Sequence, residues 1–183
     1  MAMVRAAEIA GVALNLAYTY LYLRGQLPIA YLFAALGAMA LGWTCWHRQL
    51  QAETGLHGFY LFMAGYGAWL SADSEWQVTM HGWVPHVVAV VAGAIAWAAL
   101  TPWLSKRGSS MPTLDAFTTV FSVLGTWWMI QGDPVNWIYW MVIDAVSIYL
   151  YAKRGMLWGA LLFFIYGLMA IDGWFERISW FSV

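Results

Sequence analysis

Charged side chains are scarce in this sequence: only 9% of its 183 residues are Asp, Glu, Lys or Arg, where soluble domains carry about 25%. Hydrophobic residues make up 63%, against roughly 45 to 50% in soluble domains. A body of this size keeps much of its surface exposed, so it could not hide so much apolar side chain from water. An ordinary soluble domain is therefore excluded, and the surroundings of most of the chain must be a lipid bilayer.

Other absences exclude further classes. The eight cations are scattered and the net charge is −1, so no basic face exists for nucleic acid. The single cysteine, Cys45, can form neither an internal disulfide nor a cluster of thiolate ligands. No Ser/His/Asp set, no paired catalytic carboxylates and no Gly-rich phosphate loop is visible. We therefore expect no enzyme, no cofactor and no metal site.

What the sequence has in abundance is long apolar stretches. Each is about long enough to cross the roughly 30 Å hydrocarbon layer as a helix rising 1.5 Å per residue. Divided at charges, Pro and Gly, the stretches are 8–23, 27–46, 57–72, 83–104, 113–130, 136–152 and 156–174. The sequence thus predicts an all-α integral membrane protein with seven transmembrane helices.

The cations predict the orientation of these helices. If successive helices alternate in direction, two arginines, Arg24 and Arg177, lie on one side of the membrane. The other side, which is that of the N-terminus, holds Arg5, Arg48, Lys106, Arg107, Lys153 and Arg154. Because positive residues collect in cytoplasmic loops, we expect a cytoplasmic N-terminus and a C-terminus outside.

The sequence also contains an internal repeat. Six residues recur 106 positions later: Pro28, Arg48, Tyr60, Met63, Ala64 and Gly67 reappear as Pro134, Arg154, Tyr166, Met169, Ala170 and Gly173. Upstream the displacement is 107, with Glu8, Asn15 and Thr19 answered by Asp115, Ser122 and Thr126. A change of one residue in a connecting loop explains the difference.

This repeat predicts the domain organisation. We expect a first three-helix bundle over 1–72, a linker helix over 83–104, and a second three-helix bundle over 113–176. Three helices end on the face opposite to the one where they began, so the linker helix lets the second copy run parallel to the first. Parallel repeats of this 3+1+3 kind are a transporter architecture.

A polar stripe runs along the stretch 113–130. Its members, spaced by three or four residues, are Asp115, Thr118 or Thr119, Ser122 and Thr126. Such residues share one helix face. Ser and Thr often only hydrogen-bond neighbouring helices in bilayers, but the recurrence of the stripe in the first copy favours two stripes that face one cavity.

The stretch 136–152 carries a second polar feature. Trp137, Trp140 and Asp144 lie at positions i, i+3 and i+7 on one face, and Asp144 is roughly 12 Å along the axis from Asn136. An unpaired ionisable group at that depth costs at least about 2.5 to 3.5 kcal/mol, so it should face a wet cavity or a partner. Tryptophan rings beside a carboxylate form a slot for a flat cation. A structural hydrogen bond to a neighbouring helix is the alternative.

Two histidines leave other classes of function open. His57 lies one turn before Tyr60, and a lone intramembrane histidine is more often a packing residue than a ligand. With His86 it could instead supply axial ligands to a haem. A structural membrane protein, whose polar stripes only pack helices, is a further alternative.

The sequence resembles the nicotinamide riboside transporter (PnuC) family, which shares its fold with the SWEET sugar transporters. Its landmarks here are Glu8-Ile-Ala-Gly11, Tyr60, Tyr66-Gly67-Ala-Trp69, Leu114-Asp115-Ala-Phe-Thr118-Thr119, Asn136-Trp137-Ile-Tyr-Trp140 with Asp144, and Lys153-Arg154-Gly155 with Tyr166 and Gly173-Trp174. The pattern Trp-x-x-Trp-x-x-x-Asn/Asp is the specific one among them. The resemblance covers nearly the whole chain.

The resemblance implies a vitamin-precursor transporter in a bacterial inner membrane, working by facilitated diffusion with alternating access. A cytoplasmic kinase would trap the substrate by phosphorylation, and a homo-oligomer is compatible with this role. The implied substrate-binding residues are Trp137, Trp140, Asp144 and Asn136, with Thr118, Thr119, Tyr60 and His57. The stretch 27–46 lacks the family's Trp-Pro start and His57 replaces a usual glutamine, so thiamine is an alternative substrate.

Overall fold

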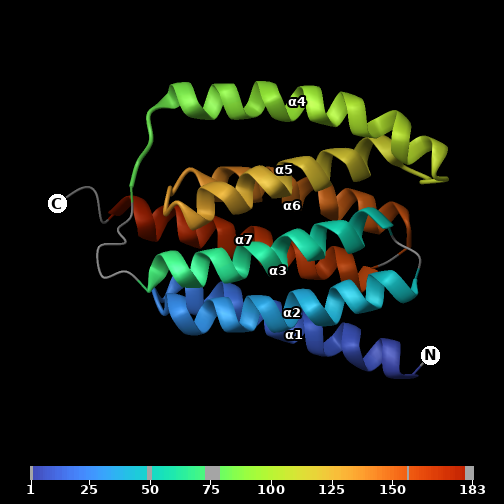
Figure 1. Ribbon diagram of the computed structural model, residues 1–183, viewed down its shortest axis with the longest axis horizontal. Helices are drawn as coiled ribbons and strands as arrows, with labels where there is room; N and C mark the ends of the chain where they lie inside the picture. Colours follow the sequence, from blue (N-terminus) through green and yellow to red (C-terminus); the bar gives the residue numbers. More distant parts are fainter. Residues whose placement is uncertain (1, 49–50, 73–78, 156, 180–183) are drawn as a thin grey trace. The chain divides into compact units, whose positions relative to one another are not determined.

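The chain is folded into α-helices throughout the part that the computed structural model describes, residues 2–48, 51–72, 79–155 and 157–179 (Figure 1). The chain divides into two compact units, Met1–Gln77 and Val78–Val183. The first unit contains α1 (Ala2–Leu23), α2 (Leu27–His47) and α3 (Gln51–Ser71). The second contains α4 (Trp83–Lys106), α5 (Pro112–Ile130), α6 (Asn136–Lys153) and α7 (Leu157–Ser179). The predicted all-α class is therefore confirmed.

Both units place the second helix of their triplet in the middle. Helix α2 packs against α1 and α3, and α6 packs against α5 and α7. Helix α4 packs on α5 and so belongs to the second unit. The limits 1–72, 83–104 and 113–176, and the parallel arrangement of the two bundles, stay predictions.

Helices α1 and α5 end in turns of the same type. A glycine with positive φ follows each of them, Gly25 and Gly132, both at φ 72°. Gln26 and Asp133 then donate their N–H to the carbonyl five residues earlier, over 3.0 Å. This is a Schellman cap, which needs the left-handed conformation that glycine adopts without strain.

Two glycines let the middle helix approach the third helix closely. A Cβ added at Gly67 would lie 2.5 Å from the Tyr31 ring, and one added at Gly173 would lie 2.5 Å from the Trp137 ring. Tyr31 and Trp137 are 106 residues apart, like the two glycines. The two units thus use one packing device at equivalent positions: a buried aromatic ring of the middle helix seated on a glycine.

The outer surface is apolar, as a bilayer requires. By length and composition alone, three described segments could cross a membrane: Leu27–His47, Trp83–Lys106 and Gly159–Glu176. Helix α4 is largely exposed, since only Gly93 and Leu104 are buried along its length. Its exposed apolar side chains include Trp83, Val84, Val87, Val88, Val91 and Ile95.

Several helices extend beyond the apolar stretches. Helix α1 begins at Ala2 instead of residue 8, α3 at Gln51 instead of 57, and α7 continues to Ser179 instead of 174. Charged residues stand in these extensions, among them Arg5 and Glu53. Hydropathy predicts the part of a helix that lies in hydrocarbon, whereas its polar ends continue past that layer.

Candidate functional site

Helix α6 begins in a turn that Asp133 organises. The Oδ1 atom of Asp133 accepts the N–H of Val135 over 2.8 Å, and the side-chain amide of Asn136 donates to the Asp133 carbonyl over 2.5 Å. The Oδ1 atom of Asn136 is buried and has no donor among the described residues. Asn136, a predicted substrate-binding residue, thus uses its amide to hold the helix start.

Asp144 stands in the middle of α6, whose 18 residues run from Asn136 to Lys153. The Asp144 side chain is 2% exposed. It lies on the side of α6 that faces α7, as a Cβ added at Gly167 of α7 would be 3.8 Å from the Asp144 Cβ. In the described parts of the chain no group donates a hydrogen bond to the carboxylate. The structure therefore places an unpartnered carboxylate at mid-span, where an unpaired charge is costly.

The two predicted tryptophans share α6 with Asp144 but pack against different neighbouring helices. Trp137 is buried against Gly173 of α7, while Trp140 lies against Gly125 of α5, with Cε2 3.3 Å from where a Cβ would stand. The indole N–H of Trp140 is buried and finds no acceptor within the described ranges. One ring thus packs towards α7 and the other towards α5.

The polar stripe of α5 mostly bonds to its own helix. Thr118 donates to the carbonyls of Leu114 and Asp115, each over 3.1 Å, and Thr126 donates to Ser122 over 2.8 Å. Such bonds satisfy hydroxyls inside a helix and occupy their donors. Half-buried Thr119 has no partner in the described part of the chain.

The acid at the start of the stripe belongs to an ion pair. Asp115 accepts from Arg154 of α6 over 2.7 Å and from Ser109 over 2.5 Å. In the first unit Glu8 pairs with Arg48 over 2.5 Å. These acids and arginines are the ones related by the repeat, and each arginine is the C-cap of the middle helix, where the helix dipole favours a cation. We assign both pairs a structural role.

His57 and Tyr60 lie on α3 of the first unit. Their ring centroids are 5.7 Å apart in a T-shaped arrangement, and His57 packs its Cβ towards Gly42 of α2. The Nδ1 atom of His57 is buried without a partner among the described residues. The equivalent pair in α7, Phe163 and Tyr166, is also T-shaped. Both units thus contain the contact between the two rings, whereas the buried ring nitrogen of His57 has no counterpart in Phe163 of the second unit.

The structure adds a cluster that the sequence did not predict. Asp133 is fully buried, and its Oδ2 atom meets His81 Nδ1 at 2.9 Å and His86 Nε2 at 3.2 Å. The other ring nitrogen of His86 lies 3.3 Å from the Tyr139 hydroxyl. Within the described ranges no group of three such side chains can hold a metal ion. Because 47 to 53 residues separate the bonded side chains, no local motif could reveal this hydrogen-bonded cluster.

Ser147 is a second residue that sequence reasoning missed. It is 2% exposed and stands one turn after Asp144 on α6. The spacing of three residues places both side chains on one helix face. This spacing is the feature of the sequence that could have identified Ser147. Asp144 and Ser147 together form a short polar strip in an otherwise apolar helix.

A bundle of described helices with an apolar outer surface and a carboxylate buried at mid-span defines a multi-pass membrane protein. A model of the nicotinamide mononucleotide transporter family matches residues 5–181. The chain therefore belongs to that family.

Individual relatives carry related names. The chain is 24% identical over 166 residues to the nicotinamide riboside transporter PnuC of Haemophilus influenzae, a match that covers 87% of the chain and 65% of the relative. Over 75 residues it is 33% identical to the protein of the same name from Neisseria mucosa, covering 41% of the chain and 27% of the relative. The chain thus spans less than two thirds of the length of these relatives.

A solved structure shows the fold. The crystal structure of the vitamin B3 transporter PnuC matches with a TM-score of 0.74 and 18% identity, over 94% of this chain and 82% of the other. The predicted resemblance and the predicted all-α membrane fold, with seven helices in the described ranges, are confirmed. Both relatives are named transporters, in agreement with the prediction that the chain is not an enzyme.

Proposed function

We propose that this protein carries nicotinamide riboside across the membrane by facilitated diffusion. The observation that carries the proposal is Asp144, a carboxylate that is buried at mid-span and has no donor among the described residues. Nicotinamide riboside has a pyridinium ring with a fixed positive charge. Such a ring would neutralise the carboxylate, and the binding would offset the cost of holding a charge at that depth.

The aromatic side chains supply the second part of the proposed site. Trp137 and Trp140 precede Asp144 by two turns and one turn on α6 and pack towards α7 and α5. In the proposed site a flat cation beside the carboxylate would meet one of these indole faces. A cation over a desolvated indole gains about 2 kcal/mol. The indole N–H of Trp140, which lacks an acceptor in the described chain, is a donor for a substrate oxygen.

Hydroxyl groups of α5 and α6 are the candidates for contacts with the ribose. Thr119 and Ser147 are the candidates, because neither has a partner within the described residues, whereas Thr118 is bonded to its own helix. Tyr60 and His57 belong to the first unit, and their part in the pocket stays a prediction from the sequence. Asn136 stays one too, through its unpartnered Oδ1 atom.

The remaining parts of the proposal concern direction and trapping. The described membrane segments α2 and α4 hold no Lys, Arg, Asp or Glu before their last turn, and Asp144 is the acid at mid-span of α6, so an ion-coupling relay is hard to build. We infer a uniporter with alternating access in a bacterial inner membrane, with a cytoplasmic N-terminus. A cytoplasmic kinase would retain the substrate, because a phosphate adds charge of about −1.5 to −2 that opposes Asp144.

The haem alternative finds no support at His86. Both of its ring nitrogens have protein partners, Tyr139 and Asp133. An axial ligand needs one nitrogen free for iron. A structural role alone is tested by ligand binding, since a protein without a pocket gains no stability from the vitamin.

The test is uptake into liposomes that contain the purified protein. We expect saturable entry of labelled nicotinamide riboside that excess thiamine leaves unchanged, and equilibration without an imposed gradient. Entry of labelled thiamine instead would identify the thiamine branch of the family. Entry of neither compound would refute the transport proposal.

Two variants of Asp144 test its role. Asp144→Ala should lower uptake at least about tenfold, from the loss of a charge interaction in a low-dielectric site. Asp144→Asn keeps an oxygen in place and removes the charge, so it should narrow the preference for nicotinamide riboside over its reduced, uncharged form. Asp172→Asn, on exposed α7 surface, is the matched control. Unchanged uptake in Asp144→Ala would remove the proposed pocket.

A further inference from the structure

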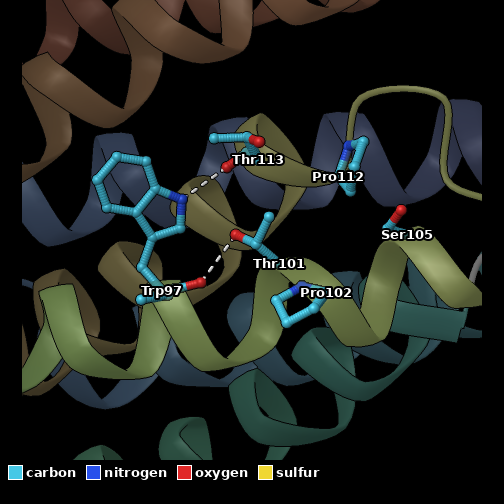
Figure 2. A pocket seen from close by; sticks show the side chains of 7 residues that line it. Trp97, Thr101, Pro102, Ser105, Pro112 and Thr113 are labelled. Carbon is cyan, nitrogen blue, oxygen red and sulfur yellow. Dashed lines mark hydrogen bonds between the residues drawn. The ribbon is translucent and has the colours of Figure 1, made fainter.

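A groove opens between α4 and the start of α5. It has a volume of about 460 Å³ and is lined by Trp97, Ala98, Thr101, Pro102, Ser105, Pro112 and Thr113 (Figure 2). The indole ring and the two prolines make most of its wall apolar. Ala98, Pro102 and Ser105 are exposed, and only Gly93 and Leu104 are buried along α4. The groove therefore opens away from the core of the second unit, and in a membrane-spanning helix we expect its surroundings to be lipid.

Proline at position 102 shapes this groove. Pro102 lies inside α4 and has no N–H, so the carbonyl of Ala98 loses its usual helical donor. The Thr101 hydroxyl donates to the Trp97 carbonyl, and the Trp97 indole N–H donates to the Thr113 carbonyl, each over 2.8 Å. Figure 2 shows this second bond tying α4 to α5 beside the cavity. The indole is therefore held in place as one wall.

Positive charge stands at the end of the groove. Lys106 is one turn after Pro102, on the same side of α4, and it is exposed without an ion-pair partner among the described residues. The nearby acid, Asp115, is already paired with Arg154. Arg107 packs over the ring of Trp103, 4.8 Å from its centroid, and adds a second cation at this end of the helix. The local charge is therefore positive, next to an apolar channel.

We propose that this groove binds an anionic phospholipid of the surrounding membrane. An acyl chain would lie along Trp97, Ala98 and Pro102, and the phosphate would meet Lys106, with the Ser105 hydroxyl as a further donor. Basic sites between membrane helices on the cytoplasmic side bind acidic headgroups, and the positive-inside distribution predicts that side for Lys106. Neither the binding of the acyl chain nor that of the phosphate depends on the transported substrate.

The experiment measures lipid binding to the full chain in detergent. Native mass spectrometry gives the affinity for phosphatidylglycerol and phosphatidylcholine, and thermal unfolding gives the shift in midpoint for each lipid. We expect phosphatidylglycerol to bind more tightly and to raise the midpoint more. Lys106→Gln should weaken phosphatidylglycerol about fivefold, the effect of one basic residue near a lipid surface. Ala98→Leu, which fills the groove, should weaken both lipids.

The matched control is Lys153→Gln, which removes an exposed cation from the last turn of α6, a helix that contributes no lining residue to the groove. It should leave lipid affinity unchanged. Equal weakening by Lys153→Gln would show general membrane electrostatics and overturn the proposal, as would equal affinities of the two lipids for the parent chain. Glycerol 3-phosphate serves as the soluble headgroup, and binding of it alone would overturn the role of the acyl chain. Because no transport is measured, these outcomes are separate from those of the uptake experiment.

Discussion

The two equivalent ion pairs should differ in their contribution to stability, because they differ in burial. The side chains of Asp115 and Arg154 are 9% and 22% exposed, whereas those of Glu8 and Arg48 are 34% and 40% exposed. Exposed pairs contribute about 0 to 1 kcal/mol. A charge-assisted bond removed from a buried site costs about 1.5 to 3 kcal/mol, since it leaves its partner charge unsatisfied.

The substitutions are Asp115→Asn and Glu8→Gln, which keep side-chain size and remove charge. From the burial of each pair we expect Asp115→Asn to lower the free energy of unfolding by about 2 kcal/mol and Glu8→Gln by less than about 1 kcal/mol. The Ser109 hydroxyl, which also bonds to Asp115, adds to the first cost. Unfolding in detergent, followed by helix content against denaturant, measures both values.

Salt and a double variant complete this test. In 1 M salt, where charges are screened beyond about 3 Å, the small cost of Glu8→Gln should vanish while that of Asp115→Asn persists. Adding Arg154→Gln to Asp115→Asn should restore part of the stability, because the unpaired charge is then gone. Equal costs for the two single variants, or a salt-sensitive cost for Asp115→Asn, would refute the reasoning from burial.

Two further perturbations act on packing and on the buried cluster. Gly173→Ala should lower the free energy of unfolding by about 1 to 3 kcal/mol, because its Cβ would stand 2.5 Å from the Trp137 ring. Gly65→Ala is the control: a Cβ there faces open space, so this change should be neutral or stabilising. Equal effects of the two changes would contradict the contact with Trp137. Asp133→Asn should lower the free energy of unfolding by about 2 kcal/mol in the parent chain and by clearly less in a His86→Phe background, since the two residues share a bond. Additive losses of stability in the same unfolding assay would show that the two residues act independently.

Hydropathy predicted the helices because the cost of exposing polar backbone in hydrocarbon leaves a bilayer-spanning chain few choices. It could not predict where the helices end. Helix α3 begins at Gln51, six residues before the apolar stretch, and includes Glu53 and Thr54 in its first turn. Helix ends depend on local caps and neighbours in water, which leave no long apolar pattern.

For the candidate site, sequence spacing identified the residues but not their partners. The depth of Asp144 followed from counting along one helix, and its burial agrees with that depth. The position of Trp137 on Gly173 required knowing that α6 and α7 pack in that register. The bonds of Asp133 to two histidines join segments that are distant along the chain, so only the fold brings them together.

The internal comparison of the two units separates packing from chemistry. The units agree where helices must pack, as at the aromatic rings on Gly67 and Gly173. They differ at mid-span of the middle helix, where Asp144 and Trp140 of the second copy correspond to Ala38 and Ala34 of the first. Packing makes the same demand on both copies, but a ligand such as nicotinamide riboside has one cationic ring and no twofold symmetry. A single carboxylate with its tryptophan is therefore what such a ligand needs, which is why we assign the proposed cation slot to the second copy alone.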